Sequence, residues 1–296
     1  MREVPKLAQV KLETITPLHI GAGQGGGKPF DDECLDGRSI PREYRPPPRR
    51  HGVPEVVKLR RSWSDRKGTP YIPASTLRGF LRGLYTGALE ADGATDPVDE
   101  ADKIFGSTDQ AGAIALNDLL PDTPPETFTA HLKRYLPATT AAGRSRGRSK
   151  QSFDVEMVEA GAAFTGQALY VDDTLREVLE KIYAQRETLT EWLYTGSGNR
   201  KRPNPERTIS GSPIHKVPIE EIKDRLFEQD GDRWTITWKL GRYAKSYAKA
   251  LARRRSIGLP HAYYLVDGQV PGWVRVTFDL APPGAEFRLN EWLEEA

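Results

Sequence analysis

The sequence of 296 residues predicts an α+β fold that begins with a ferredoxin-like unit. Residues 7–20 alternate apolar and polar side chains, as a strand with one buried face does. A helix is expected from about 75 to 90, followed by a short strand near 112–117. That strand and another at 152–158 are both expected to pair with a further strand at 163–171. The order strand, loop, helix, strand, strand is consistent with a ferredoxin-like unit.

The helix that begins near residue 75 carries the most informative local pattern. Ser75 or Thr76 is expected to cap it by accepting hydrogen bonds from its first free backbone N–H groups. Arg78 and Arg82 lie one turn apart and share a face. Such a helix suits an anion such as a nucleic-acid backbone, and the same pattern is also typical of an ordinary amphipathic helix with solvated arginines. The apolar positions expected to face the core are Leu77, Phe80, Leu81 and Leu84.

Further elements follow the same kind of pattern. A second short helix is expected near 97–104, and a longer one at 173–194 with an apolar stripe on one face. Residues 195–213 are rich in Gly, Ser, Arg and Pro and predict a loop. Residues 234–240 alternate as a strand does, and 273–278 form the last strand. The stripe of the longer helix consists of Leu175, Val178, Leu179 and Ile182.

We expect two modified ferredoxin-like halves that share one core, rather than two independent domains. The first half spans 1–172 and contains an insertion at about 28–70 that is rich in arginine and proline. The second half spans 173–296 and begins with the helical segment. A loop as long as the insertion is unusual in a compact domain unless it is functional or has its own substructure.

Composition narrows the class of protein. Hydrophobic residues make up 38% of the chain and charged residues 28%, which suits a globular protein with long loops. The net charge is only +2, but Arg and Lys concentrate in 42–67, 144–150 and 239–255, which favours a localised anion-binding surface. The single cysteine, Cys34, excludes an internal disulfide and a cysteine-based metal cluster. Without a signal peptide or a stretch that could span a membrane, a cytoplasmic protein with no membrane partner is expected.

Several motifs occur in order along the chain. A strand leads into His-Ile-Gly-x-Gly at 19–23, and Tyr-Ile-Pro-x-Ser-x-Leu-Arg-Gly follows at 71–79. Phe-Gly at 105–106 precedes a short strand that ends in Asp118, and Glu-x-Val-x-x-Gly-x-x-Phe occupies 156–164. This order resembles the RAMP superfamily of CRISPR effector proteins. The resemblance implies a ferredoxin-like (RRM-like) RAMP fold and an RNA-binding function.

The C-terminal part looks most like one branch of that family. Residues 239–249 and 264–275 are similar to the Csm-type (type III-A) subunit that caps the backbone filament at the 3′ end of the CRISPR RNA (crRNA), although 239–249 lacks the double glycine of many relatives. The resemblance implies a crRNA-binding, filament-capping subunit of an antiviral ribonucleoprotein that helps to define the crRNA 3′ end. Its implied partners are the crRNA 3′ region, the neighbouring backbone RAMP subunit, the small helical subunit, a nuclease that trims the guide and, indirectly, target RNA.

His19 has two interpretations. Some RAMP relatives cut RNA with a histidine as general acid and base, which makes a guide-processing endoribonuclease one alternative function. A histidine at the end of a strand also serves by packing or hydrogen bonding, and no second catalytic group is visible near it in the sequence. We assign no catalytic residue and count His19 among the RNA contacts that the resemblance implies.

The glycines after His19 form a candidate contact with the RNA backbone. Gly21, Gly23 and Gly25 permit backbone geometries that let main-chain N–H groups approach a phosphate. Loop flexibility alone is the alternative explanation of these glycines. The segment has neither a Walker A ending nor a Rossmann fingerprint, and no cofactor is expected.

Asp31 and Asp32 raise a second alternative function. Clustered carboxylates can hold Mg²⁺ and activate water, and related backbone subunits cut target RNA with an Asp in this general region. A backbone RAMP subunit with metal-dependent endoribonuclease activity would use them in this way. The surrounding residues depart from the Gly-x-x-Asp-Asn-x-Val pattern of those subunits, and a solvated or ion-paired loop also explains the carboxylates. We expect no metal site.

Two basic segments complete the predicted RNA contacts. At 143–150 four basic residues alternate with Gly and Ser, so an extended chain would place all four charges on one side, where the family has an RNA-contacting thumb-like loop. At 239–249 a helix would carry a basic edge beside an aromatic one, which suits RNA, or it would bury its tyrosines and solvate its lysines. The residues assigned to RNA in these segments are Arg144, Arg146, Arg148, Lys150, Arg242, Lys245 and Lys249, in addition to Ser75, Arg78 and Arg82 of the helix.

Overall fold

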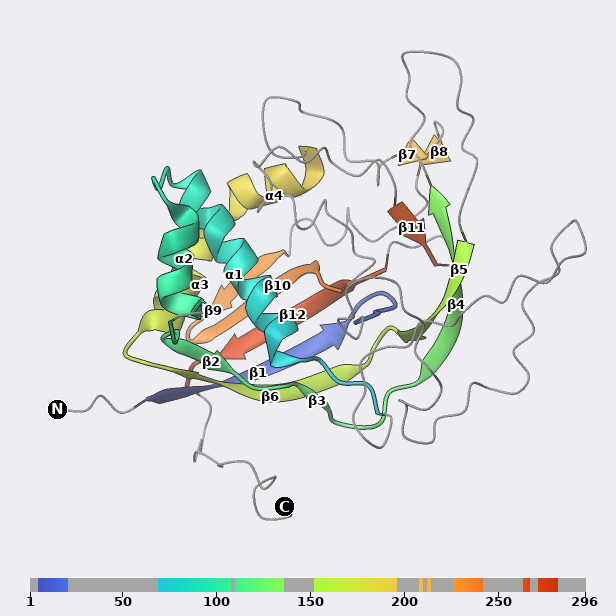
Figure 1. Cartoon of the computed structure of the whole chain (residues 1–296), viewed down its shortest axis with the longest axis horizontal. Helices are drawn as coiled ribbons and strands as arrows, with labels where there is room; N and C mark the ends of the chain where they lie inside the picture. Colours follow the sequence, from blue (N-terminus) through green and yellow to red (C-terminus); the bar gives the residue numbers. More distant parts are fainter. Residues whose placement is uncertain are drawn as a thin grey trace, which may run out of the picture.

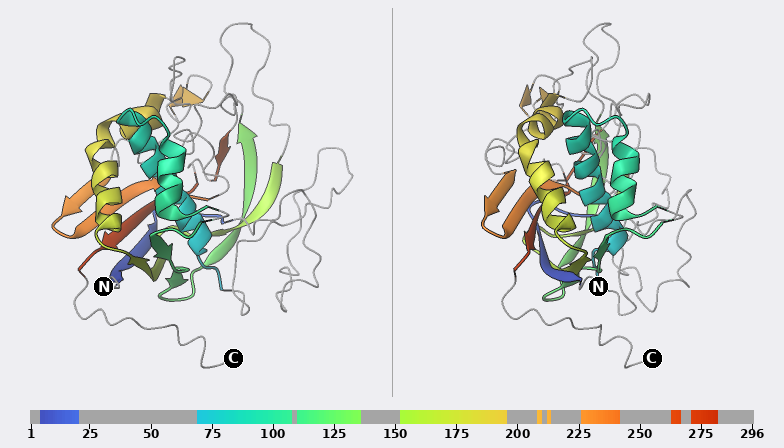
Figure 2. Two further views of the ribbon diagram at one scale, coloured as in Figure 1. Left: turned by 60° about the vertical axis from the view of Figure 1, so that its left-hand side comes forward. Right: turned by 90° about the vertical axis from the view of Figure 1, so that its left-hand side faces the viewer.

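A seven-stranded sheet with helices gathered on one face forms the centre of the protein (Figures 1 and 2). The computed structural model describes residues 5–20, 69–107, 110–135, 152–195, 208–209, 212–213, 226–241, 263–266 and 271–281. Every strand pair in the sheet is antiparallel. Its strands are β1 (Lys6–Thr14), β2 (Ile114–Leu116), β3 (Leu120–Pro121), β6 (Ala163–Tyr170), β9 (Phe227–Asp230), β10 (Arg233–Lys239) and β12 (Trp273–Asp279).

The strand order is that of a ferredoxin-like unit with an extension. The strands β2, β6, β1 and β12 lie side by side in this order, and β10 and β9 continue the sheet beyond β12. Helix α1 (Ala74–Ala91) connects β1 to β2 along the chain, and α3 (Thr174–Ala184) follows β6. One helix after each of the two central strands, with antiparallel pairing throughout, is the arrangement expected of this fold. The predicted α+β, ferredoxin-like class is confirmed.

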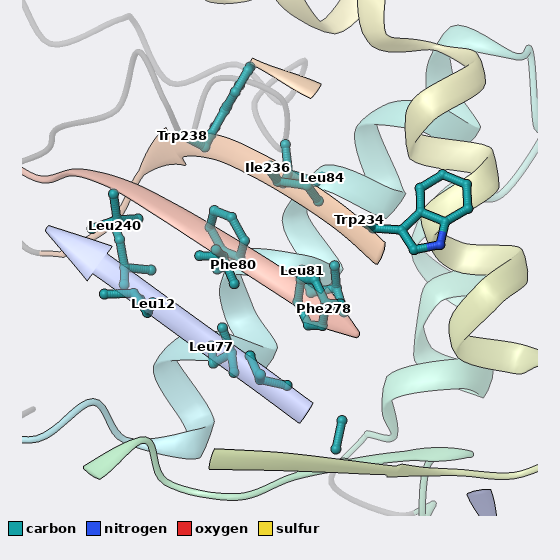
Figure 3. Close-up of a cluster of buried hydrophobic side chains, with 14 of the residues drawn as sticks. Leu12, Leu77, Phe80, Leu81, Leu84, Trp234, Ile236, Trp238, Leu240 and Phe278 are labelled. Carbon is teal, nitrogen blue, oxygen red and sulfur yellow. The ribbon is translucent and has the colours of Figure 1, made fainter. Parts of the chain in front are cut away.

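The main core lies between α1, α3 and the sheet. The alternation predicted for β1 buries Val10 and Leu12, which pair in register with Phe278 and Val276 of β12. Figure 3 shows the side chains of α1 directed at these strands. The apolar positions predicted for both helices are all buried: Leu77, Phe80, Leu81 and Leu84 in α1, and Leu175, Val178, Leu179 and Ile182 in α3.

A second sheet, in the order β11-β4-β5, corrects one predicted strand pairing. Its strands are β4 (Thr127–Tyr135), β5 (Ser152–Val158) and β11 (Tyr263–Leu265). The sequence pattern paired β5 with β6, but β5 pairs with β4, which the pattern did not predict, and β6 pairs with β1. The turn between β5 and β6 is held by Thr14 of β1, whose hydroxyl donates to the Glu159 carbonyl at 2.7 Å and accepts from Ala162 N–H at 2.9 Å. These bonds direct β5 and β6 into different sheets.

The remaining elements agree with the predicted pattern where the structure describes them. Helix α2 (Pro97–Phe105) forms as expected, and the helix predicted at 173–194 is divided into α3 and α4 (Arg186–Thr195). Two short strands, β7 (Thr208–Ile209) and β8 (Ser212–Pro213), lie within the predicted loop at 195–213. Among the described residues, no helix is long and apolar enough to cross a membrane.

The predicted division of the chain at residue 172 stays a prediction. Strand β12, which follows that point in the chain, pairs with β1, which precedes it, so the two parts share one sheet. The insertion at about 28–70 and the segment 242–255 lie outside the described residues, apart from the last two residues of the insertion.

Candidate nucleic-acid interface

The side chains predicted to bind RNA on α1 lie together on its outer face. Ser75, Arg78, Gly79 and Arg82 are spaced so that they share the face opposite the buried stripe. They line a solvent-open cavity of about 450 Å³. The cavity is completed by residues at the end of α2 and just beyond it, namely Asp102, Gly106 and Ser107. The sequence predicted Ser75, Arg78 and Arg82 as site residues, but not Gly79 or the three residues that follow α1 in this cavity.

The Phe-Gly motif explains why the end of α2 reaches this cavity. Phe105 is buried and packs edge-to-face on Tyr85 of α1, with ring centroids 6.0 Å apart. Gly106 follows with φ +81°, in the left-handed region that favours glycine. The turn is tight, because a Cβ on Gly112 would lie 2.5 Å from the carbonyl carbon of Phe105. The motif therefore fixes α2 beside α1 and sends the chain back into β2.

The predicted helix cap is wrong. The structure places Pro73 at the N-cap position, with Ser75 and Thr76 inside the first turn, and no side chain of the N-cap residue forms a capping bond. The Ala74 N–H instead donates to the Asp118 carboxylate, Oδ1, at 2.6 Å. Because a carboxylate of the chain already occupies this end of the helix, the anion site depends on the arginines and Ser75 rather than on the helix terminus.

The two arginines of the cavity have different surroundings. Arg82 forms an ion pair with Asp102, with 39% of the arginine side chain and 27% of the aspartate side chain exposed. Arg78 is exposed, and no acidic group among the described residues forms an ion pair with it. Among the described residues that line the cavity, two arginines and one aspartate give a net positive charge, and Arg78 is the most accessible cation.

His19 is buried, with 2% of the residue exposed. Its Nδ1 lies 2.9 Å from the carbonyl oxygen of Glu156 in β5, and because a carbonyl only accepts, Nδ1 carries the proton and donates. The neighbouring residue, Leu18, exchanges two backbone hydrogen bonds with Val158, each of 2.9 Å. His19 thus helps to fasten the second sheet to the end of β1, which agrees with its structural interpretation. A contact between its ring and RNA stays a prediction, and the burial of the ring counts against it.

Two of the predicted RNA-binding segments begin from neighbouring points of the fold. Gly241, with φ +93°, lies close to His19, because a Cβ on Gly241 would be 2.5 Å from the His19 carbonyl oxygen. The segment that contains Gly21, Gly23 and Gly25 follows Ile20, and the segment that contains Arg242, Lys245 and Lys249 follows Gly241. These six residues lie outside the described residues.

The third predicted segment connects the strands of a hairpin. In the β4–β5 pair, Lys133 lies opposite Ser152, and residues 136–151 connect the end of β4 to the start of β5. Arg144, Arg146, Arg148 and Lys150 belong to this connection and lie outside the described residues. Asp31 and Asp32 also lie outside them. No group of three or more His, Cys, Asp or Glu side chains in the described part is placed to hold a metal ion.

Lys239, at the end of β10, is not a surface cation. Only 5% of the residue is exposed, and its Nζ lies 5.0 Å from the centroid of the Trp273 ring. Burial lowers the pKa of Lys239 from 10.5 to about 7, because desolvation disfavours the charged amine. The basic segment predicted from residue 239 onward therefore begins with a buried lysine, which is not on the protein surface.

On the sheet face opposite the helices, the exposed residues that the structure describes offer no platform on which RNA bases could stack. Lys11 and Glu13 of β1 form an ion pair there at 3.0 Å, and the Thr235 and Thr277 hydroxyls lie 3.3 Å apart. RNA-binding sheets of the RRM type present exposed aromatic rings on this face. The aromatic ring that β12 contributes to this face, Trp273, is fully buried. The α1–α2 cavity is thus the stronger candidate among the described surfaces.

Comparison with known proteins identifies the family. The model of the RAMP superfamily matches residues 11–202, which include α1, α2 and both strands that flank the β5–β6 turn. The chain belongs to the RAMP superfamily. No curated protein matches the sequence. This RAMP protein is similar in fold to a chain of a Csm–crRNA–target RNA ternary complex of a type III-A CRISPR–Cas system, with 15% identity and a TM-score of 0.49 over 92% of this chain and 100% of that one. A chain of a type III-B Cmr-β complex bound to cognate target RNA gives 18% identity and a TM-score of 0.32 over 67% of this chain and 55% of that one.

Proposed function

We propose that this RAMP protein is a crRNA-binding subunit of a type III CRISPR ribonucleoprotein, and that the α1–α2 cavity grips the phosphate backbone of the guide. The observation that carries the proposal is the convergence of Ser75, Arg78 and Arg82 on one solvent-open cavity. A hydroxyl donor and two guanidinium groups on one face suit a phosphate, since arginine presents several N–H donors in a planar fork. The order of the RAMP motifs along the chain supports the same assignment.

Gly79 adds a second argument from the same helix. A glycine inside a helix costs about 1 kcal/mol relative to alanine. Packing does not require it here, because a Cβ on Gly79 would meet no atom within 4 Å. It lies between the two arginines and lines the cavity. Because glycine has no side chain, the backbone of a ligand can approach the helix closely at this point. Such an approach would explain the glycine, which the packing of the helix does not.

A salt titration of RNA binding tests the cavity. Replacing both Arg78 and Arg82 with Ala should weaken binding of single-stranded RNA by about tenfold or more, because charged hydrogen bonds are lost. Each lost phosphate contact should also reduce the slope of log K against log salt by about 0.7. Arg275→Ala, on the uncovered sheet face, removes one exposed arginine elsewhere and serves as the matched control. An unchanged slope in the double variant would remove the cavity from the interface.

Gly79 permits a test that keeps every charge. Gly79→Gln should obstruct the cavity and weaken RNA binding, whereas Gly83→Gln should leave it unchanged. Gly83 lies one turn further along α1, does not line the cavity, and would also accept a Cβ without meeting an atom within 4 Å. Equal binding by the two variants in fluorescence anisotropy would contradict a ligand that enters beside Gly79.

We further propose that the protein is the type III-A (Csm) subunit that caps the filament at the crRNA 3′ end, in the cytoplasm. Support comes from the C-terminal resemblance at 239–249 and 264–275. A cap must offer one face to the last backbone subunit and lack the other, since two compatible faces would propagate the filament. Native mass spectrometry of the assembled complex should therefore find one copy of this chain beside several of the backbone subunit, and deleting it should leave guides with less defined 3′ ends. Two or more copies per particle would contradict the cap.

We propose that the subunit is not itself a nuclease. His19, the histidine that the family resemblance suggests for metal-independent cleavage, is buried, and its ring is hydrogen-bonded to the Glu156 carbonyl. The purified protein should leave single-stranded RNA intact with and without Mg²⁺. Cleavage that requires Mg²⁺ and is lost in Asp31→Ala or Asp32→Ala would favour the backbone-nuclease alternative instead.

A further inference from the structure

Asp102 stands out among the residues of the α1–α2 cavity because it carries the opposite charge. Its carboxylate pairs with Arg82 across the gap between α2 and α1, while Arg78, one turn earlier, has no such pair among the described residues. A site for a polyanion gains nothing in affinity from a carboxylate in its lining, because the carboxylate repels phosphate and competes for the guanidinium. Its presence therefore calls for another role.

The surroundings of the pair allow it to open. Both side chains are partly exposed, and exposed ion pairs are weak because water and salt screen them. A phosphate that enters the cavity offers Arg82 the same planar, bidentate recognition that the carboxylate provides. Asp102 is also firmly placed, because its backbone carbonyl accepts from Gly106 N–H at 2.8 Å and Phe105 anchors the end of α2 on Tyr85. The carboxylate is thus held at a fixed point from which Arg82 can exchange partners.

Resting on the proposed RNA-binding function, we propose that Asp102 is a positioning and specificity residue that holds Arg82 in the free protein and releases it only to a strand already bound at Arg78. Arg78 makes the first contact because it is exposed and unengaged by a described carboxylate. Arg82 joins when a second phosphate of the same strand lies near enough to replace Asp102. Isolated or poorly placed anions do not recruit Arg82, so the pair lowers affinity for unsuitable polyanions.

The test measures binding of a fluorescently labelled single-stranded RNA to the full chain as a function of salt. Asp102→Asn keeps the size and the hydrogen-bonding shape of the side chain but removes its charge. It should strengthen binding by up to about fivefold, the equivalent of one exposed ion pair. The slope against log salt should change little, because Arg82 neutralises the same phosphate in the bound state of both proteins. Asp102→Glu, which restores the charge, should return the affinity toward that of the natural protein.

Two controls separate this role from a general effect of charge or folding. Asp99→Asn removes a carboxylate one turn earlier on α2 that does not line the cavity, and it should change affinity much less. In an Arg82→Ala background, Asp102→Asn should give a smaller gain, from the lost repulsion of phosphate alone, because the residue through which it acts is absent. Thermal melting reports whether each variant is folded, and Asp102→Ser replaces Asp102→Asn if the latter is not.

The outcomes distinguish this proposal from the function on which it rests. If Arg78→Ala leaves the affinity and the salt slope unchanged, the RNA-binding function of the cavity is wrong. If Arg78→Ala weakens binding but Asp102→Asn matches either the natural protein or Asp99→Asn, only the role of Asp102 is overturned. A gain from Asp102→Asn that is undiminished in the Arg82→Ala background also overturns it.

Discussion

Basic side chains occupy two regions of this protein that differ in what surrounds them. In the α1–α2 cavity, Arg78 is exposed and Arg82 shares a partly exposed ion pair with Asp102. At the end of β10, Lys239 is buried against Trp273, and burial lowers its pKa to about 7. In the cavity the charge stays available to a ligand, whereas at the end of β10 desolvation favours the neutral amine.

The difference follows from register and not from the local sequence. Lys239 lies on the sheet face opposite the helices, two positions after Thr237 and directly opposite Trp273. At the other end of the same strand Arg233 is exposed, yet around Lys239 that face is closed, with Thr237 at 1% and Trp273 at 0% exposure. A count of basic residues in the sequence would treat Lys239 and the arginines of the cavity alike. We therefore propose the cavity, and not Lys239, as the place where an anion binds.

The largest expected effect concerns Lys239. Its pKa is about 7 in the folded protein and 10.5 when exposed, so between these pH values the unfolded chain binds more protons and stability rises with pH. Below about pH 7 both states are charged and the full burial penalty, several kcal/mol, applies. Lys239→Met should therefore raise the free energy of unfolding most at pH 7 and below, with the gain shrinking toward pH 10. Urea denaturation at several pH values measures this, and a gain independent of pH would contradict a buried amine.

The close approach of Gly241 to His19 gives the next effect. Gly241→Ala should destabilise the protein by about 2 to 5 kcal/mol, because left-handed backbone strain adds to a clash with the His19 carbonyl. Gly161 is the matched control, since its φ is +87° and a Cβ on it would meet nothing within 4 Å. Gly161→Ala should cost only about 1 to 2 kcal/mol. Thermal unfolding of the two variants should separate strain from contact, and equal losses would mean that the two segments do not meet as the structure places them.

A smaller effect is expected at the start of α1. Asp118→Ala removes the carboxylate that accepts from Ala74 N–H and should destabilise the protein by about 1 kcal/mol. Asp118→Asn keeps an acceptor oxygen and should recover most of this loss. If both variants unfold at the same denaturant concentration as the natural protein, the helix does not depend on this cap.

The smallest effect on stability should come from the cavity itself. Arg78→Ala changes an exposed position and should alter the free energy of unfolding by less than about 0.5 kcal/mol. Gly79→Gln, also at an exposed position, should stabilise the helix by somewhat less than about 1 kcal/mol. Their RNA affinities should change far more than their stabilities. A large loss of stability in Arg78→Ala would mean that this arginine supports the structure rather than the site.

Periodicity allowed the sequence to predict the local elements well. Alternation identified β1, β10 and β12, and the spacing of apolar residues identified the buried faces of α1 and α3. Ser75, Arg78 and Arg82 were placed on a common face for the same reason, since residues three, four and seven apart in a helix must share one. The predicted pairing of β5 with β6 failed because an alternating pattern specifies a strand and its buried face but not its partner.

The sequence by itself determined that the chain forms an α+β fold with a basic helix face, because each of these properties is set by neighbours within one or two turns. Tertiary structure alone decided which distant groups meet. It brought Asp118 to the start of α1 and Asp102 to Arg82, and it enclosed Lys239 beside Trp273. Such contacts depend on how helices and strands pack. Packing follows from the apolar surface that the whole core buries rather than from the spacing of any motif.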